Sequence, residues 1–375
     1  MNITHELKKF ALAATIALIA VPAFAQTTAT TDPVGFITYS LPGNADSYLY
    51  IPFKRNPDYA GATSGAVASN VIAASGTPNW GVNAFAPGAS LQPRFYVLIR
   101  SGAKSGMFYA VSSNDSSTLT VDLGGDTISS DVVAGTAYQI CAFDTLGSIF
   151  PSGQGVNGSA GHLIGARQSE VLIPESSLAG TNFAPASSYY YYNGATLPGA
   201  GWRLAGQTGT IVNDVVLYPD SYIIVRHNVA TGTSLTTMGT VQMGQVQLPL
   251  TTLADNTNQD IPIGIPVAGN QTLFQSNLFQ SGAFQGGASH LIGSRKDELL
   301  VWDNSFVGKN KAPDASYYYY TGTAGNGPGW RLAGDTINVR DAEIVITPGK
   351  AFTIRKKSTG LAATVFWKVT PTYVQ

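Results

Sequence analysis

Aromatic and cationic side chains recur together at two places in the chain, and they are the residues best suited to hold a ligand. Four tyrosines follow Ser188, four more follow Ser316, and a Gly-Trp-Arg sequence comes after each run. Because side chains alternate along a strand, two tyrosines of each run face outward, and with the Trp of the next strand they could stack on sugar rings. The candidate ligand-binding residues are Tyr190, Tyr192, Trp202, Arg203, Tyr318, Tyr320, Trp330 and Arg331.

Packing within a sheet is the alternative role for these residues, and it is the favoured one. Aromatic pairs across neighbouring strands are ordinary sheet stabilisers, each contributing about 0.2–1 kcal/mol. Arg167 and Arg295 recur together with Glu170 and Glu298. A fixed Arg–Glu or Arg–backbone contact inside each unit explains this recurrence without any ligand.

The histidines and the acidic turns lack the spacing of a metal site. His162 and His290 hold matching positions, and each is the only histidine of its motif. A zinc site needs three or four converging ligands, so we expect each histidine to orient a turn by hydrogen bonding. Segments 122–126 and 255–260 are rich in oxygen ligands but lack the closing acid of a calcium loop. We expect solvated turns there, and no cofactor or metal.

No catalytic motif is present in the sequence. The chain has no Gly-x-Ser-x-Gly elbow, no phosphate-binding glycine loop and no His-Glu-x-x-His sequence. A glycoside hydrolase needs only two acids that meet in the fold, so a secreted hydrolase stays as the second alternative function. We expect a protein without enzyme activity.

Three stretches of the chain recur at an offset of 128 residues, and chance does not give so many collinear matches. They are 161–167 with 289–295, 188–192 with 316–320, and 201–206 with 329–334. Between them Asn182 matches Asn310, and the Ala-Pro pair at 184–185 matches the pair at 312–313; after a one-residue slip, 215–226 matches 344–355. Segment 50–53 resembles 264–267 more weakly. The chain is therefore expected to contain an internal duplication.

Short β-branched and aromatic runs separated by turn residues predict an all-β fold. Runs 94–100, 107–111 and 118–122 are typical of an antiparallel meander, and each tyrosine run with its Trp-Arg-Leu segment predicts a hairpin. The turns at Pro219-Asp220 and Pro348-Gly349 are expected to join apolar strands, and 275–279 to form one helical turn. We expect antiparallel β-sandwich or meander domains: an N-terminal β domain (26–143), repeat unit 1 (144–230), connecting strands (231–270) and repeat unit 2 (271–375).

The first 25 residues predict a secretory signal peptide. Lys8 and Lys9 precede an apolar run, and Ala23-Phe24-Ala25 has the small-residue pattern of a cleavage site. We expect cleavage after Ala25 and export to the periplasm, the outer surface or the medium; an uncleaved anchor is the less favoured alternative. No later run reaches the roughly 18 apolar residues of a membrane helix, so no membrane span is expected after cleavage.

The composition narrows the range of partners. Charged residues make up 11% of the chain, against about 25% in an average globular protein. Cleavage would remove two lysines and one glutamate and leave a net charge of −2. Such a balance gives no electrostatic reason to bind nucleic acid. Cys141 is the single cysteine, so no intramolecular disulfide forms, and we expect it to be a small buried residue.

The paired tyrosine, Gly-Trp-Arg and Pro-x-x-x-Ile/Phe-x-Val/Ile-Arg patterns, placed behind a signal peptide, resemble a family of exported verrucomicrobial-type proteins without an assigned activity. The starting segment 32–38 and the closing segment 363–367 are similar to that family as well. The resemblance covers most of the mature chain and implies export and β architecture, with no catalytic residues. We expect an exported structural or interaction protein of the cell surface or envelope, which assembles with itself or binds extracellular polysaccharide. Carbohydrate binding through the Tyr and Trp faces is the first alternative.

Overall fold

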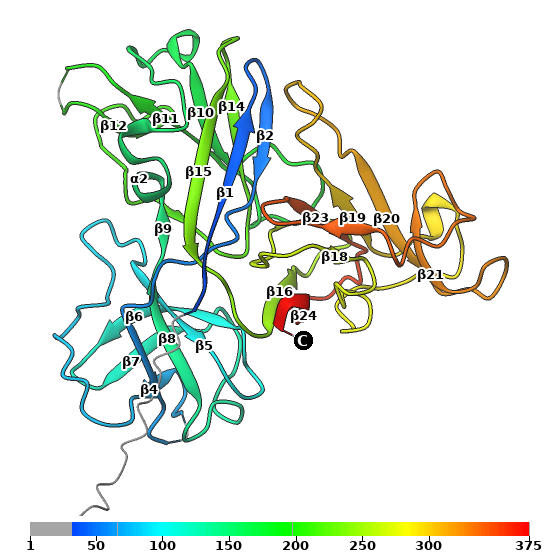
Figure 1. Ribbon diagram of the computed structural model, residues 1–375, viewed down its shortest axis with the longest axis horizontal. Helices are drawn as coiled ribbons and strands as arrows, with labels where there is room; N and C mark the ends of the chain where they lie inside the picture. Colours follow the sequence, from blue (N-terminus) through cyan, green and yellow to red (C-terminus); the bar gives the residue numbers. More distant parts are fainter. Residues whose placement is uncertain (1–31, 66, 197, 375) are drawn as a thin grey trace, which may run out of the picture. The chain divides into compact units, whose positions relative to one another are not determined.

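The described residues of this computed structural model, 32–65, 67–196 and 198–374, form strands joined by turns (Figure 1). The all-β fold class is therefore confirmed, and all pairs of named strands are antiparallel. The α-helix in this part is α2 (Leu146–Ile149), which a capping box between Thr145 and Ser148 begins. Residues 275–279 form non-helical turns, so the helical turn predicted there is wrong. No helix of the described part is long and apolar enough to cross a membrane.

A six-stranded sheet is formed by the part of the chain between residues 59 and 142. Its order is β3 (Tyr59–Ala62), β8 (Ala137–Ala142), β5 (Phe95–Ile99), β6 (Phe108–Asn114), β7 (Thr118–Asp122) and β4 (Val71–Ala73). The predicted meander is confirmed, because β5, β6 and β7 are consecutive neighbours. Alternation places Val111, Leu119 and Val121 in one apolar core. Cys141 on β8 is buried, as predicted.

A five-stranded sheet contains the first tyrosine run. Its order is β12 (Gly201–Leu204), β11 (Ser187–Tyr192), β10 (Ser169–Ile173), β14 (Ile223–His227) and β2 (Asp46–Leu49). The predicted hairpin is confirmed, with Tyr191 opposite Trp202 in the register of β11 and β12. Leu49, Val171 and Val225 lie in the core on one face of this sheet.

A second five-stranded sheet contains the other tyrosine run. Its order is β17 (Gln259–Ile263), β23 (Phe352–Lys356), β19 (Glu298–Val301), β20 (Ala315–Tyr320) and β21 (Gly329–Leu332). The hairpin of β20 and β21 places Tyr319 opposite Trp330. Glu298 lies opposite Arg355 here, as Glu170 lies opposite Arg226 in the first sheet.

Four two-stranded sheets and four short 3₁₀ helices complete the fold. The pairs are β1 (Val34–Leu41) with β15 (Thr233–Thr240), β16 (Val246–Thr252) with β24 (Ala363–Val369), β9 (Asp144–Thr145) with β13 (Val216–Leu217), and β18 (Gln271–Thr272) with β22 (Ile344–Ile346). The 3₁₀ helices are η1 (Pro151–Gly153), η2 (Ile164–Ala166), η3 (Ile292–Ser294) and η4 (Thr372–Val374). Turns do occur at 219–220 and 348–349, but the strands that they join belong to different sheets, so neither turn closes a hairpin.

The two strands nearest the start of the described chain pair with strands far along it. β1 pairs with β15, and β2 with β14. Residues 34–49 are thus hydrogen-bonded to the segment around the first tyrosine run, and not to the six-stranded sheet. The strand pairing therefore differs from the division expected from the sequence, in which residues 26–143 form one domain.

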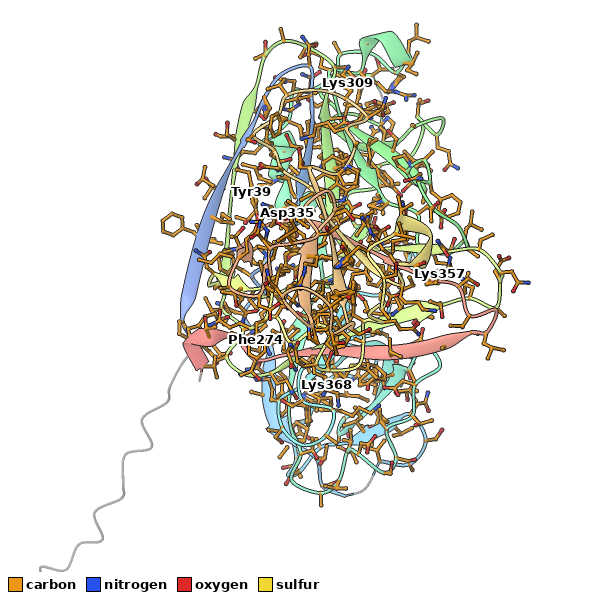
Figure 2. All side chains as sticks on the ribbon, turned by 90° about the vertical axis from the view of Figure 1, so that its right-hand side faces the viewer. Tyr39, Phe274, Lys309, Asp335, Lys357 and Lys368 are labelled. Atoms are coloured by element: carbon orange, nitrogen blue, oxygen red, sulfur yellow. The ribbon has the colours of Figure 1, made fainter. Side chains whose placement is uncertain are left out.

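Tyr50 and Gly264 lie in direct contact, and each is fixed by a backbone hydrogen bond to a turn. Tyr50 N donates to the Gly349 carbonyl (3.1 Å), and Gly264 N donates to the Asp220 carbonyl (3.0 Å). The Tyr50 hydroxyl donates to the Pro219 carbonyl at 2.7 Å, and buried Tyr39, labelled in Figure 2, donates to the Tyr50 carbonyl. A Cβ on Gly264 would overlap the Tyr50 ring, so only glycine fits at that position.

We predict that Gly264→Ala destabilises the protein by about 1–3 kcal/mol, because the added methyl group has to displace the buried Tyr50 ring. Urea denaturation followed by tryptophan fluorescence measures the free energy of unfolding. Gly209→Ala is the matched control, since a Cβ there meets open space. Equal stability of the two variants would contradict the close contact between Tyr50 and Gly264.

Candidate functional site

The structure divides the predicted ligand-binding residues between the two faces of each hairpin. Trp202 lies opposite Tyr191 and contacts it on the core face, whereas Arg203 lies opposite Tyr190 on the other face. The second hairpin repeats this arrangement. All eight predicted residues are buried, with Trp202 and Trp330 at most 1% exposed. The open aromatic platform that was considered for them is absent, and their burial supports the packing role.

The outward face of each hairpin is covered by side chains of the same sequence motif. His162 stacks on Tyr192 with a centroid distance of 4.2 Å, and its Nδ1 is hydrogen-bonded to the Tyr190 hydroxyl at 2.7 Å. Arg167 lies over the Tyr190 ring at 5.0 Å. The equivalent contacts of the second hairpin connect His290 and Arg295 with Tyr318 and Tyr320. Hydrogen bonding by these two histidines is thus confirmed.

The recurring arginines form the local contacts that the sequence predicts. Arg167 pairs with Glu170, and Arg295 with Glu298, each at 3.3 Å. Buried Arg203 donates to the carbonyls of Gly199, Trp202 and Thr208. Arg331 donates in the same way to Gly327, Trp330 and Thr336. Each buried guanidinium therefore fixes the loop that follows its tyrosine run.

Two exposed turns present apolar side chains at matching places, and we call them the apolar tips. Leu163 and Ile164 beside η2 are 81% and 78% exposed; Leu291 and Ile292 beside η3 are 73% and 79% exposed. The anchoring contacts of the neighbouring histidine and arginine hold each turn on its hairpin. The sequence motif contains these residues, but their exposure could not be deduced from it.

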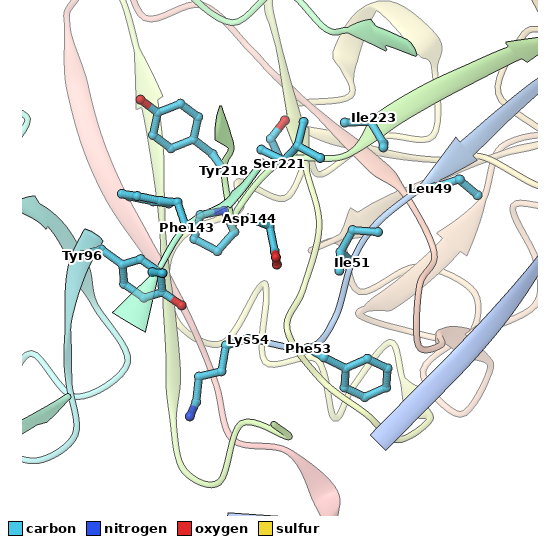
Figure 3. Close-up of a pocket in the computed structure, with 13 residues that line it drawn as sticks. Leu49, Ile51, Phe53, Lys54, Tyr96, Phe143, Asp144, Tyr218, Ser221 and Ile223 are labelled. Atoms are coloured by element: carbon cyan, nitrogen blue, oxygen red, sulfur yellow. The ribbon is translucent and has the colours of Figure 1, made fainter. Parts of the chain in front are cut away.

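A small pocket beside β9 contains a carboxyl group with perturbed acidity. Figure 3 shows the Asp144 side chain directed into this pocket, near Tyr96 and Lys54. Burial raises the pKa of Asp144. The pocket volume is about 30 Å³, enough for one or two water molecules, whereas ligand sites typically have about 300–1,000 Å³. The pocket is therefore too small for the substrate of a hydrolase.

Asp220 is a second carboxyl group with a raised pKa, at the turn between β13 and β14. Burial raises its pKa from 3.8 to about 6. Between about pH 4 and 6 the folded chain therefore keeps a proton that the unfolded chain loses. The contribution of Asp220 to stability consequently falls as the pH rises through this window.

We predict that Asp220→Asn is more stable than the wild type above pH 6 and equally stable below pH 4, because the amide has no charge to bury. Urea denaturation between pH 4 and 7 measures the difference. Asp255→Asn is the control of opposite sign, since hydrogen bonds from Thr257 lower the Asp255 pKa. A pH-independent difference between Asp220→Asn and the wild type would contradict the assignment.

A cavity of about 640 Å³ lies between faces of the two five-stranded sheets. β2, β10 and β14 line it from the first sheet, and β17, β19 and β23 line it from the second. Two loops complete its wall, residues 174–185 and 302–313. Its volume lies within the range of about 300–1,000 Å³ that is typical of ligand sites.

An ion pair of the first sheet fixes the loop that comes from the second sheet. Arg226 on β14 binds Asp46 on β2 in a bidentate manner, with both N–O distances 2.7 Å. Arg226 Nη2 also donates to Asn310 Oδ1 at 2.6 Å, and Asn310 N donates to Asp46 at 2.7 Å. The hydrogen bonds with Asp46 raise the pKa of Arg226. The loop around Asn310, which includes Lys309 of Figure 2, thus crosses to the first sheet.

The reciprocal contact joins the first loop to the second sheet. Arg355 on β23 binds Asp260 on β17 at 2.7 and 2.9 Å. Arg355 Nη2 donates to Asn182 Oδ1, and Asn182 N donates to Asp260, both at 2.9 Å. Asn182 and Asn310 both adopt positive φ, which asparagine tolerates better than most residues. Two equivalent contacts therefore hold the loops over the cavity.

Aromatic side chains line the cavity near the first of these contacts. Tyr48 and Trp302 stack with centroids 4.2 Å apart and planes 3° apart. Trp302 Nε1 donates to Thr353 Oγ1 at 3.1 Å. The Tyr222 hydroxyl is hydrogen-bonded to the same Thr353 Oγ1, also at 3.1 Å. Lys311 lies 5.6 Å from the Tyr48 ring centroid, and burial lowers the pKa of Lys311. The aromatic cluster therefore connects both sheets and one loop.

The sequence did not single out these cavity residues as a site, although a signal was present. Asn182 and Asn310 match at the 128-residue offset, and Arg226 matches Arg355 after the one-residue slip. Those matches indicated that the two asparagines, and likewise the two arginines, occupy equivalent positions. Their partners Asp46 and Asp260 belong to no local motif, so the contacts themselves were not predictable.

Comparison with protein-family models, with curated proteins and with solved structures gives no match for this chain. Within the part of the chain that the structure describes, no three His, Cys, Asp or Glu side chains lie close enough to hold a metal ion.

We predict that Arg226→Met destabilises the protein by about 3 kcal/mol, because it leaves the buried Asp46 carboxylate without its cation. The double variant Asp46→Asn with Arg226→Met should lose less stability than Arg226→Met alone, since no charge stays buried. Thermal and urea denaturation of both variants measure this, with exposed Arg94→Met as control. A double variant that loses at least as much stability as Arg226→Met alone would contradict the coupling.

Proposed function

We propose that this chain is an exported, non-catalytic protein of the cell surface or envelope that acts by assembling with further copies of itself. The signal peptide that supports export, with expected cleavage after Ala25, lies outside the described residues. The resemblance to exported verrucomicrobial-type proteins supports the same location. Periplasm, outer surface and medium are all compatible with it.

An internal duplication is part of this proposal. It is supported by the sequence matches at the offset of 128 residues and by the equal strand order of the two five-stranded sheets. The pairs β1–β15 and β16–β24 extend the correspondence. We place one unit at 34–240, interrupted by the six-stranded sheet after β2, and the other at 246–369. Each unit then carries one apolar tip.

The observation that carries the proposed assembly is the exposure of both apolar tips. Exposed apolar surface favours burial by about 25 cal/mol per Å², and a Leu-Ile pair on an anchored turn loses little entropy when it binds. The net charge of the chain is close to zero, so copies repel each other little. Two tips per molecule allow each copy to contact two others.

Carbohydrate binding by the tyrosine hairpins, the first alternative, loses its basis because those side chains are buried. A hydrolase, the second alternative, gains no support from the small pocket that holds Asp144.

We predict that the signal-cleaved protein forms species well above the 39.3 kDa mass of the full-length chain, in a concentration-dependent manner. Replacing Leu163, Ile164, Leu291 and Ile292 by Ser should leave a monomer, because both contact surfaces are lost. Replacing only Leu163 and Ile164 should stop assembly at the dimer, since one tip remains. Light scattering coupled to size-exclusion chromatography measures these masses.

The control is Val82→Ser with Leu361→Ser, which removes two exposed apolar side chains away from the tips. This variant should assemble like the wild type. A wild-type protein that stays monomeric at every concentration would contradict the proposed assembly, and so would equal assembly of the variant that lacks both tips.

A further inference from the structure

The charge of the cavity between the five-stranded sheets is balanced. Each aspartate on its wall, Asp46 and Asp260, is neutralised by a bidentate arginine. Lys311 and Glu175 add one charge of each sign. An anionic or cationic ligand would therefore meet no excess of opposite charge, and the cavity is suited to an uncharged ligand.

Flat apolar surfaces form much of the cavity wall. The stacked Tyr48 and Trp302 belong to it, as do Tyr222 and the prolines at 174, 185, 262 and 313. Leu172 and Leu300 contribute from the two sheets. Rings of this kind pack against the C–H faces of a flat, polar-edged ligand.

Hydrogen-bonding groups without a partner belong to the two loop contacts in the cavity wall. The Oδ1 atoms of Asn182 and Asn310 accept from arginines, and their Nδ2 groups have no partner among the described residues. Nη1 of Arg226 is likewise without a partner in the described part, because Nε and Nη2 make its hydrogen bonds. Each of the two loop contacts therefore offers an unused donor to a ligand.

We infer that this cavity binds a short, uncharged oligosaccharide, with sugar rings against Tyr48, Trp302 and the prolines. Asn182 and Asn310 donate to hydroxyl groups of the sugar from the two loops. The volume of about 640 Å³ lies within the range of sites that enclose a small ligand. The fixed loops pre-form the site, so little ordering is needed when the sugar binds.

Other ligand classes fit the wall less well. A lipid chain needs a continuous apolar lining, and the two ion pairs of the wall interrupt it. A nucleotide needs an excess of cations, which the neutralised arginines do not supply. None of the residues that line the cavity belongs to an apolar tip, so the site does not depend on the proposed assembly.

The test uses the signal-cleaved protein and isothermal titration calorimetry with maltotetraose, cellotetraose, chitotetraose and mannotetraose. At least one of these sugars should bind saturably, and its binding should change the fluorescence of the protein through Trp302. Ala184→Trp together with Ala312→Trp fills the cavity from its two loops without removing a hydrogen bond. This variant should lose at least about tenfold in affinity.

Ala186→Trp is the matched control, since it adds the same side chain at an exposed residue directly after the first loop that does not line the cavity. It should bind like the wild type, and circular dichroism and the melting temperature of all variants should agree. Absence of saturable binding for all four sugars would overturn the inference. Equal affinity of the filled variant would also overturn it, because the sugar would then bind elsewhere. Light scattering of the filled variant keeps this result separate from the assembly test.

Discussion

Two neutralised carboxylates, Asp46 and Asp260, hold together the region on which the rest of the structure depends. Each lies on the edge strand of a five-stranded sheet and accepts hydrogen bonds from an arginine of the same sheet and from a loop of the other sheet. A buried carboxylate without such partners destabilises the folded state, so removing one of its partners lowers the free energy of unfolding. The exchange of loops therefore fixes the distance between the sheets and preserves the cavity between them.

The contact between Tyr50 and Gly264 shows that these two positions cannot both carry a large side chain. Tyr50 N donates to the Gly349 carbonyl, and Gly264 N donates to the Asp220 carbonyl. Two tyrosines could not occupy this place, because one ring already fills the space beside the opposite backbone. Segments 50–53 and 264–267 accordingly differ at their first residue, which is Tyr50 in one and Gly264 in the other.

Local features of the fold were predictable because they depend on neighbouring residues. The alternation of apolar and polar residues predicted the meander and the two hairpins. The recurrence of Arg167 with Glu170 predicted their ion pair. The contact of His162 with Tyr190 was not predictable. Alternation along the strand shows that Tyr190 faces away from the core, but it does not show whether another side chain packs on that face. The pairing of Arg226 with Asp46 was not predictable either, because 180 positions separate them and Asp46 belongs to no motif.

The pairing of β1 with β15 has a consequence for the way the chain acquires its structure. Thr38 on β1 is hydrogen-bonded to Thr236 on β15, 198 positions further along the chain. β2 likewise pairs with the distant strand β14. Contacts of such long sequence separation form slowly, since a large loop has to close before they are gained. Synthesis thus begins with the strands whose partners lie farthest along the chain. Their edges stay unpaired until residues 223–240 have been synthesised, and by then the whole six-stranded sheet can already have formed.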